Sequence, residues 1–239
     1  FMFLSAASFV VFYFIFKKNF TRVKANEELW FYLFFTTAAV VAVTLVLYTG
    51  SERNFEVAFR HAFFQVTSTI STTGFATTDY TLWPQVAIVI VFMLMFAGGS
   101  TGSTTGGIKM ARHLLTLKNL HNVTVRLLHP SAVMPVKLNG QVVPESINSL
   151  MTVFVQLYIL IFLAGMMIIL LSGIPAIEAA GASVSALSCV GPGLGASGNM
   201  SNYAHFNGVA KMTMVVLMII GRLEIFTIFA LFTRPFWKK

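Results

Sequence analysis

A run of small and hydroxyl residues at 97–109, AGGSTGSTTGGIK, is the first candidate for chemistry. Glycine-rich loops often bind phosphate, and the P-loop pattern requires a glycine, four residues, a second glycine, then Lys and Ser or Thr. Gly102 and Gly107 have that separation, but Ile108 occupies the lysine position and Lys109 comes one residue late. An apolar run at 86–96 precedes the loop where a P-loop needs a strand. We therefore exclude a nucleotide site and look for another role.

Two shorter turns carry oxygen atoms suited to a dehydrated cation. The segments STTGF at 71–75 and SCVGPGLG at 188–195 each place a glycine directly after residues whose backbone carbonyls can face inward. Rings of such carbonyls replace the hydration shell of a monovalent cation in ion channels, and glycine adopts the φ values that keep them facing inward. Threonine and glycine are also typical of ordinary helix ends, so the surrounding elements decide. The candidate ion-binding residues are Thr72, Thr73, Gly74, Phe75, Cys189, Val190 and Gly191.

The composition indicates a membrane protein. Of 239 residues, 56% are hydrophobic and 10% are charged, whereas soluble domains have roughly 25% charged residues. A bilayer-crossing helix needs about 20 apolar residues, and the runs 30–50, 82–96, 149–172 and 209–232 approach that length. Residues 1–16 are too short to span, and we expect them to be the end of a preceding helix. The single Cys189 excludes an internal disulfide and leaves the redox compartment undecided.

The net charge of +8 is explained by membrane topology. With these spans, basic clusters at 17–24, 109–137 and 234–239 fall on one side of the membrane, which the positive-inside rule makes cytoplasmic. The opposite side holds only Arg53, Arg60 and Lys211. The charge is therefore not a nucleic-acid footprint.

One unit occurs twice: a span, a half-length helix, an extended turn and a second span. The half-helices lie within 51–75 and 173–195, begin near Glu52 and Glu56 or near Glu178, and end in turns whose Gly74 and Gly191 are 117 residues apart. Re-entrant half-helices keep all basic clusters on one side, and such backbone is tolerated only beside water or inside protein. Helix C-termini carry partial negative charge, so the turns should attract a cation.

Several segments together resemble the Trk/Ktr/HKT superfamily of potassium transporters, most closely the bacterial TrkH/KtrB-type pore subunit. They are STTGFATTDY (71–80), MFAGGSTGSTTGGIK (95–109), GPGLG (191–195), GRLEIFTI (221–228) and RPFW (234–237). The resemblance implies an all-α membrane protein with four span–pore loop–span repeats around a pseudo-fourfold pore. This chain matches the last two repeats, at 17–128 and 147–239, joined by a cytoplasmic connector at 129–146.

The resemblance further implies K⁺ as the transported ion, no covalent cofactor, and a bacterial inner membrane with the C-terminus in the cytoplasm. Carbonyls of Thr72, Thr73, Cys189 and Val190 would ligate K⁺. Partners implied are membrane lipid, a second copy in a homodimer, and a cytoplasmic nucleotide-binding regulatory subunit. Cys189 departs from the asparagine usual in the family, which puts the support of the strand in doubt but not the carbonyl.

In this family the segment 97–107 is an intramembrane loop that obstructs the path beneath the filter. The alternative is a small-residue helix-packing surface, which Gly98 and Gly102 fit. Five glycines in ten residues disfavour a helix, at about 1 kcal/mol each. The expected gate residues are Gly98, Gly99, Gly102, Gly106, Gly107 and Arg222.

Arg222 lies inside the apolar run 215–232 and so requires a partner or water. Pairing with Glu224 is disfavoured, since residues two apart on a helix point in different directions. We expect Arg222 to meet loop carbonyls or to form a positive barrier, and Glu224 to pair with a neighbouring helix or a second subunit. Asp79 is either a cation attractor or a turn acid.

The connector carries a hairpin signal at Asn139-Gly140 and is either a docking surface for the regulator or a linker.

Two other function classes are considered. A membrane enzyme or electron carrier would need paired histidines on facing spans, but all five histidines lie outside the spans or at their edges. A Na⁺-permeable transporter of the same architecture, or a broken-helix carrier for another solute, stays open.

Overall fold

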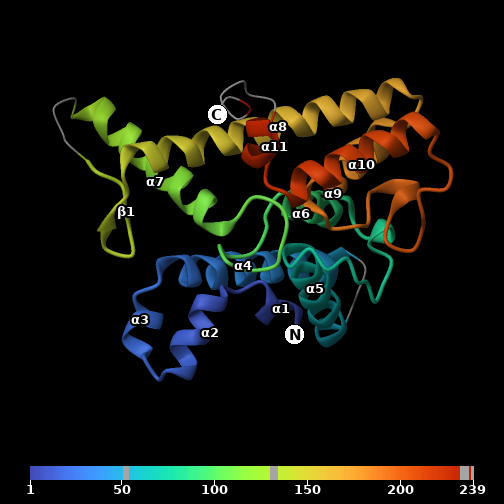
Figure 1. Ribbon diagram of the computed structural model, residues 1–239. Helices are drawn as coiled ribbons and strands as arrows, with labels where there is room; N and C mark the ends of the chain where they lie inside the picture. The colour runs from blue at the N-terminus through green and yellow to red at the C-terminus, as the bar shows by residue number, and fades with distance from the viewer. Residues whose placement is uncertain (51–53, 130–133, 232–236, 238–239) are drawn as a thin grey trace.

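The computed structural model describes residues 1–50, 54–129, 134–231 and Trp237. Glu52, Arg53, Arg234, Lys238, Lys239, most of the RPFW motif and positions 130–133 of the connector lie outside the described residues. The described chain is largely helical (Figure 1). Its helices are α1 (Met2–Ser5), α2 (Phe9–Phe16), α3 (Phe20–Lys24), α4 (Glu27–Gly50), α5 (Phe55–Ile70), α6 (Gln85–Leu94), α7 (Met110–Leu128), α8 (Glu145–Leu171), α9 (Ala176–Ser188), α10 (Gly208–Arg222) and α11 (Ile225–Leu231), with 3₁₀ turns at Tyr80–Leu82 and Gly195–Ser197.

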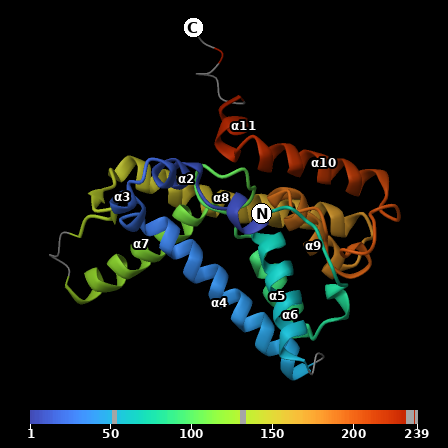
Figure 2. The ribbon, with the colours of Figure 1, turned by 90° about the horizontal axis from the view of Figure 1, so that it is seen from below.

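Two helices, α4 and α8, are long and apolar enough to cross a membrane. Each opens a unit in which a shorter helix and then a third helix follow: α4, α5 and α6 in the first, α8, α9 and α10 in the second. Within each unit the shorter helix packs against the long one. Figures 1 and 2 show α4 and α5 of the first unit on one side of the molecule and the second unit on the other, with the segment between α6 and α7 running between them. The repeated unit expected from the sequence is confirmed.

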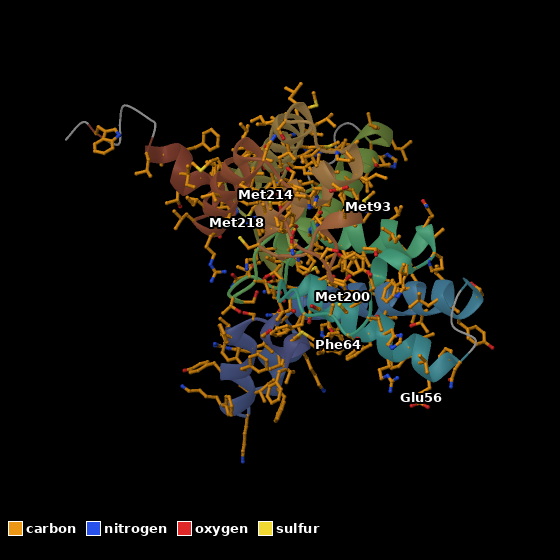
Figure 3. All side chains as sticks on the ribbon, turned by 90° about the vertical axis from the view of Figure 1, so that its right-hand side faces the viewer. Glu56, Phe64, Met93, Met200, Met214 and Met218 are labelled. Carbon is orange, nitrogen blue, oxygen red and sulfur yellow. The ribbon has the colours of Figure 1, made fainter. Side chains whose placement is uncertain are left out.

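The half-helices α5 and α9 are buried toward their C-terminal ends. Residues 65–70 of α5 and residues 181–188 of α9 are all buried. Their N-terminal ends are stabilised locally, since the Asn54 side chain accepts a bond from the Glu56 backbone N–H at 3.0 Å and Pro175 precedes the first turn of α9. Figure 3 places Glu56 at the outer end of α5, away from the centre of the molecule.

Three expected helices are shorter or broken. Residues 1–16 form α1 and α2, separated by residues 6–8, rather than one helix end. The expected span 82–96 contains only the ten-residue α6, about 15 Å of helix at 1.5 Å per residue. The expected span 209–232 divides into α10 and α11, which are bent by 104° at Leu223 and Glu224. Glu224 has φ 60°, a left-handed conformation that cannot continue an α-helix.

The hairpin expected in the connector is confirmed. Strands β1 (Lys137–Leu138) and β2 (Gln141–Val142) pair antiparallel, and Asn139 and Gly140 have φ values of 52° and 78°, as a type I′ turn requires. The Asn139 Oδ1 accepts a bond from the Glu27 N–H at 2.8 Å. The hairpin therefore lies against the first turn of α4.

Candidate functional site

The turns after α5 and α9 have the same backbone conformation. Thr72 and Cys189 are both left-handed, with φ 51° and 57°, and Gly74 and Gly191 have φ 75° and 110°. Both pairs are 117 residues apart. The hydrogen bonds repeat too: the Thr73 N–H donates to the Ser68 carbonyl at 3.0 Å, and at the same offset the Val190 N–H donates to the Ser185 carbonyl at 3.0 Å. The two turns are equivalent parts of the two units.

The two turns touch each other. A Cβ on Gly74 would lie 2.3 Å from the Val190 carbonyl oxygen, too close for any side chain. Gly191 has open space instead, so its requirement for glycine comes from φ alone. The structure thus brings the two candidate segments into one site.

Several carbonyl oxygens of these turns carry no hydrogen bond. Among the described residues, no donor reaches the carbonyls of Thr72, Thr73, Cys189 or Val190. The Phe75 carbonyl differs, because the Ser68 hydroxyl donates to it at 2.6 Å. Unpaired carbonyls held at helix C-termini can ligate a cation.

Tyr203 supports the second turn from outside the spans. Its hydroxyl donates to the Gly191 carbonyl at 2.9 Å. Burial raises the pKa of Tyr203, so the hydroxyl keeps the proton that it donates.

Asp79, which follows the first turn, accepts bonds from the Thr81 N–H at 2.9 Å and hydroxyl at 2.6 Å, as a turn acid does.

Residues 97–109 form an irregular loop, hereafter the glycine loop, so the helix-packing alternative is wrong. The Gly106 N–H donates to the Thr72 Oγ1 at 3.0 Å, and a Cβ on Gly106 would lie 2.0 Å from the Ser188 carbonyl oxygen. The loop therefore touches both candidate turns. Within it, a Cβ on Gly98 would lie 2.0 Å from the Gly106 carbonyl oxygen, while Gly102 and Gly107 have φ 78° and 68°.

Arg222 reaches the loop as expected: its Nη1 donates to the Thr104 carbonyl at 3.1 Å. Glu224 does not pair with Arg222. Its carboxylate lies 3.2 Å from Nη2 of Arg112 on α7, and the Arg112 guanidinium also lies 3.6 Å from the Phe154 ring centroid. Glu224 thus pairs with a neighbouring helix, one of the two expected arrangements.

Three anchors of the loop were missed by sequence reasoning. The buried Glu28 carboxylate accepts bonds from the backbone N–H groups of Thr101 and, at 3.1 Å, of Ala111. Near the N-terminus, the Ala6 carbonyl accepts a bond from the Ser100 N–H at 2.8 Å. An acid at the start of an apolar span was the available signal for Glu28, whereas nothing in residues 5–7 indicated a backbone contact.

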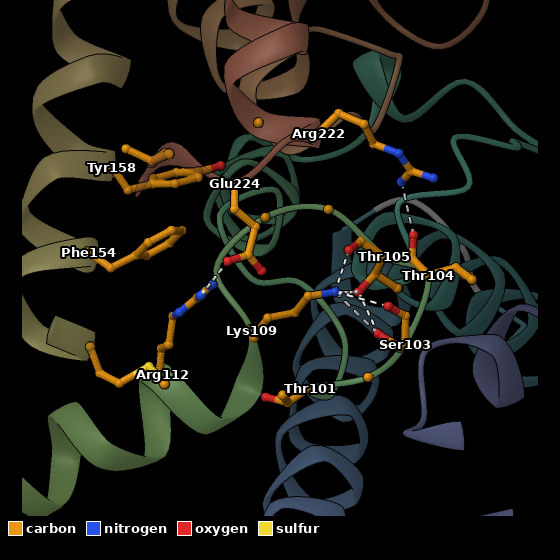
Figure 4. A pocket seen from close by; sticks show the side chains of 16 residues that line it. Thr101, Ser103, Thr104, Thr105, Lys109, Arg112, Phe154, Tyr158, Arg222 and Glu224 are labelled. Atoms are coloured by element: carbon orange, nitrogen blue, oxygen red, sulfur yellow. Dashed lines mark hydrogen bonds and ion pairs between the residues drawn. The ribbon is translucent and has the colours of Figure 1, made fainter. Parts of the chain in front are cut away.

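The third missed anchor is Lys109, which the sequence indicated only as part of a basic cluster. Its side chain turns back into the glycine loop, as Figure 4 shows. A cavity of about 490 Å³ lies there, between the loop, α8 and the end of α10. Lys109, Arg112, Arg222 and Glu224 all line this cavity. Among the described residues, no group of His, Cys, Asp and Glu side chains could hold a metal ion.

The chain is similar to known transport proteins over nearly its whole length. Residues 1–238 match the TrkH family, described as a cation transport protein. The "Trk system potassium uptake protein TrkH" of Halomonas elongata is 33% identical over 240 residues, covering all of this chain and 49% of that protein. The protein of the same name from Escherichia coli is 37% identical over 201 residues, covering 84% of this chain and 41% of its own length.

A solved structure is similar over nearly the whole chain. The crystal structure of the potassium transporter TrkH from Vibrio parahaemolyticus has a TM-score of 0.90 and 31% identity, covering 99% of this chain and 51% of that one. The chain therefore spans about half the length of the relatives it matches.

Proposed function

This chain belongs to the TrkH family of cation transport proteins, and from that premise we propose that it is the C-terminal half of a pore subunit for K⁺ uptake. K⁺ passes through a filter of backbone carbonyls, to which this chain contributes the turns at Thr72–Gly74 and Cys189–Gly191. Two further turns, in repeats outside this chain, complete a ring of four. No covalent step is involved.

The observation that carries this proposal is the contact between the two equivalent turns. Each follows the C-terminus of a buried half-helix, and each presents carbonyl oxygens to which no described residue donates a hydrogen bond. In addition, Gly74 lies against the Val190 carbonyl. Potassium uptake in the names of the relatives supports the choice of ion. The ligands in this half would be the carbonyls of Thr72, Thr73, Cys189 and Val190.

The glycine loop is the gate of this pore. Its Gly106 contacts both turns from one side, and Arg222 holds the Thr104 carbonyl. Opening requires these contacts to break, and the glycines allow the backbone to change conformation without side-chain clashes.

The basic segments between α6 and α8 face the cytoplasm of a bacterial cell, by the positive-inside rule, and the C-terminus lies on the same side. The surface formed by α7 and the hairpin there is the docking face for a nucleotide-binding regulatory subunit. The complete protein assembles as a homodimer.

The main alternative is a pore of the same architecture that also passes Na⁺, and a second is a broken-helix carrier for another solute. Ion competition separates them. A K⁺ filter gives saturable Rb⁺ influx that K⁺ blocks and Na⁺ does not. A Na⁺-permeable pore is blocked by both ions, and an organic-solute carrier exchanges solute without Rb⁺ influx.

The filter is tested by K⁺ uptake in cells that lack their own K⁺ uptake systems and express the complete gene. Gly74→Ser and Gly191→Ser should each abolish growth at low K⁺ or remove selectivity over Na⁺, because serine disfavours both φ values. Gly173→Ser is the matched control, since Gly173 also has positive φ, 93°, and open space around it. Normal K⁺ uptake in both filter variants would refute the assignment.

A further inference from the structure

The Lys109 ammonium is surrounded by uncharged oxygen atoms of the glycine loop. Its Nζ lies 3.3 Å from the Ser103 carbonyl, 3.5 Å from the Ser103 hydroxyl and 3.1 Å from the Thr105 hydroxyl, and it also bonds the Thr105 carbonyl. We call these four oxygens of Ser103 and Thr105 the oxygen cup. Figure 4 shows the lysine side chain extending into it.

No acid completes the cup. In the described part of the chain, no carboxylate lies within 4.0 Å of the Lys109 Nζ. Two carbonyls and two hydroxyls around one monovalent cation are the ligands of an ion-channel site rather than of a salt bridge. An ammonium group is also close to K⁺ in size and charge, so a cup that holds one suits the other.

The cup lies in the path that the proposed gate controls. It borders the cavity between the glycine loop, α8 and the end of α10, and Gly106, the residue after Thr105, bonds the first turn. Arg222 takes the Thr104 carbonyl, so the carbonyls of three consecutive loop residues are all engaged by side-chain cations. Both cations must release them before the loop can move.

We propose that Lys109 is a tethered blocking cation, whose ammonium occupies a site for one weakly hydrated monovalent cation in the closed glycine loop. When the lysine withdraws, the cup is free to take a permeating K⁺. This inference rests on the proposed function and assigns to Lys109 a direct role in keeping the pore closed.

Two substitutions distinguish the effect of the positive charge of Lys109 from the effect of its ammonium group fitting the oxygen cup. Lys109→Gln removes the ammonium and leaves the cup empty. Lys109→Arg keeps the charge, but a planar guanidinium does not replace a compact ammonium with rotatable donors. Lys118→Gln is the matched control, because Lys118 also lies on the cytoplasmic side and pairs with Glu27, away from the loop.

The test measures ⁸⁶Rb⁺ influx into proteoliposomes that contain the complete transporter without added regulatory protein. Lys109→Gln should raise the resting influx by about tenfold, the effect expected from losing one hydrogen bond to a charged group. Lys109→Arg should raise it as well, and Lys118→Gln should leave it at the wild-type level. Resting influx unchanged in Lys109→Gln would overturn the proposal.

A second arm uses one preparation before and after modification, which removes any effect of misfolding. In a variant with its other cysteines replaced by serine, Lys109→Cys is treated with an aminoethyl or a trimethylammonioethyl methanethiosulfonate. The aminoethyl group restores the ammonium and should return the Rb⁺ influx to the resting level of the wild type. The trimethylammonium group restores only the charge and should leave the influx raised. Equal restoration by both reagents would show that charge alone closes the pore.

The two proposals fail in different ways. If the wild-type protein carries no saturable Rb⁺ influx under any condition, the proposed function is wrong. If the wild type conducts and the Lys109 variants match it, only the blocking role is wrong.

Discussion

Thr72 and Cys189 share a conformation that few residue types adopt readily. Both have left-handed φ values at the ends of the half-helices, where asparagine is better tolerated than other non-glycine residues. The resemblance to the family implies an asparagine at position 189. The cysteine found there puts the support of the strand in doubt. The conformation gives a physical reason for an asparagine at this position. The Cys189 thiol instead lies 3.7 Å from the Met218 carbonyl.

Cys189→Asn is therefore expected to conduct like the wild type and to melt at an equal or higher temperature. Cys189→Val should lower stability, because a β-branched residue in this conformation costs about 1–2 kcal/mol. Thermal melting of the complete protein in detergent, together with K⁺ uptake, checks both. A Cys189→Asn variant that folds but no longer selects K⁺ would show that the thiol itself matters to the filter.

Individual site residues were predictable where a local rule applied. Gly74 and Gly191 follow from the φ values a carbonyl-lined turn needs, and Arg222 was conspicuous as a charge in an apolar run. Glu28 and Lys109 were not found as loop anchors, because their partners lie in a loop whose folded path cannot be read from the sequence. Their contacts depend on the path of the chain from Ala97 to Ala111.

At the scale of elements, the first turn of α4 holds two other segments in place. The Glu28 carboxylate bonds backbone N–H groups of the glycine loop and of α7. Its neighbour Glu27 pairs with Lys118 of α7, and the Lys118 Nζ also donates to the Lys137 carbonyl of the hairpin at 2.6 Å. The first turn of α4 therefore contacts the glycine loop, α7 and the hairpin, and two different side chains make these contacts. Glu28 bonds the loop and the start of α7, whereas Glu27 pairs with Lys118 away from the loop.

Glu28→Gln should weaken this junction. The substitution keeps an acceptor oxygen but removes the charge, at an expected cost of about 1–2 kcal/mol for two charge-assisted bonds. We expect a lower melting temperature and a raised resting Rb⁺ influx. Glu27→Gln is the control, since its pair is partly exposed and should contribute less than about 1 kcal/mol. Equal effects of the two variants would contradict a special role for Glu28.

Hydropathy predicted the long helices α4 and α8 but overestimated the length of the other expected helices. The run 209–232 is apolar apart from Lys211, Arg222, Glu224 and two threonines, and a charged residue in an apolar run indicates a partner rather than a bend. The bend follows from Glu224, which pairs with Arg112 on α7 and adopts a left-handed φ. Residues 1–16 likewise break where Ala6 meets the glycine loop. Tertiary contacts decide both breaks.

At the scale of the whole molecule, the two units place their equivalent turns together. The repeat was readable from sequence because both units keep the same order of elements at one offset. Its spatial consequence, the contact of Gly74 with the Val190 carbonyl, required the structure.

The proposed topology is tested by labelling single cysteines in intact cells, in a variant whose native cysteines are replaced. Asn202→Cys, in the exposed segment before α10, should react with a membrane-impermeant maleimide. Gly140→Cys, at the hairpin tip, should react only after permeabilisation, because the proposed topology places the basic segments in the cytoplasm. The reverse labelling pattern would show that the orientation in the membrane is opposite to the proposed one, with the glycine loop on the outer side of the filter.

The 104° bend between α10 and α11 has a mechanical consequence. A push along the axis of α11 is nearly perpendicular to α10, so it does not compress that helix. The push instead swings the joint at Leu223, which lies between the residue that holds the Thr104 carbonyl and the residue that holds Arg112. A sideways force on α11 would therefore load both contacts at once, the Arg222–Thr104 hydrogen bond and the Glu224–Arg112 ion pair.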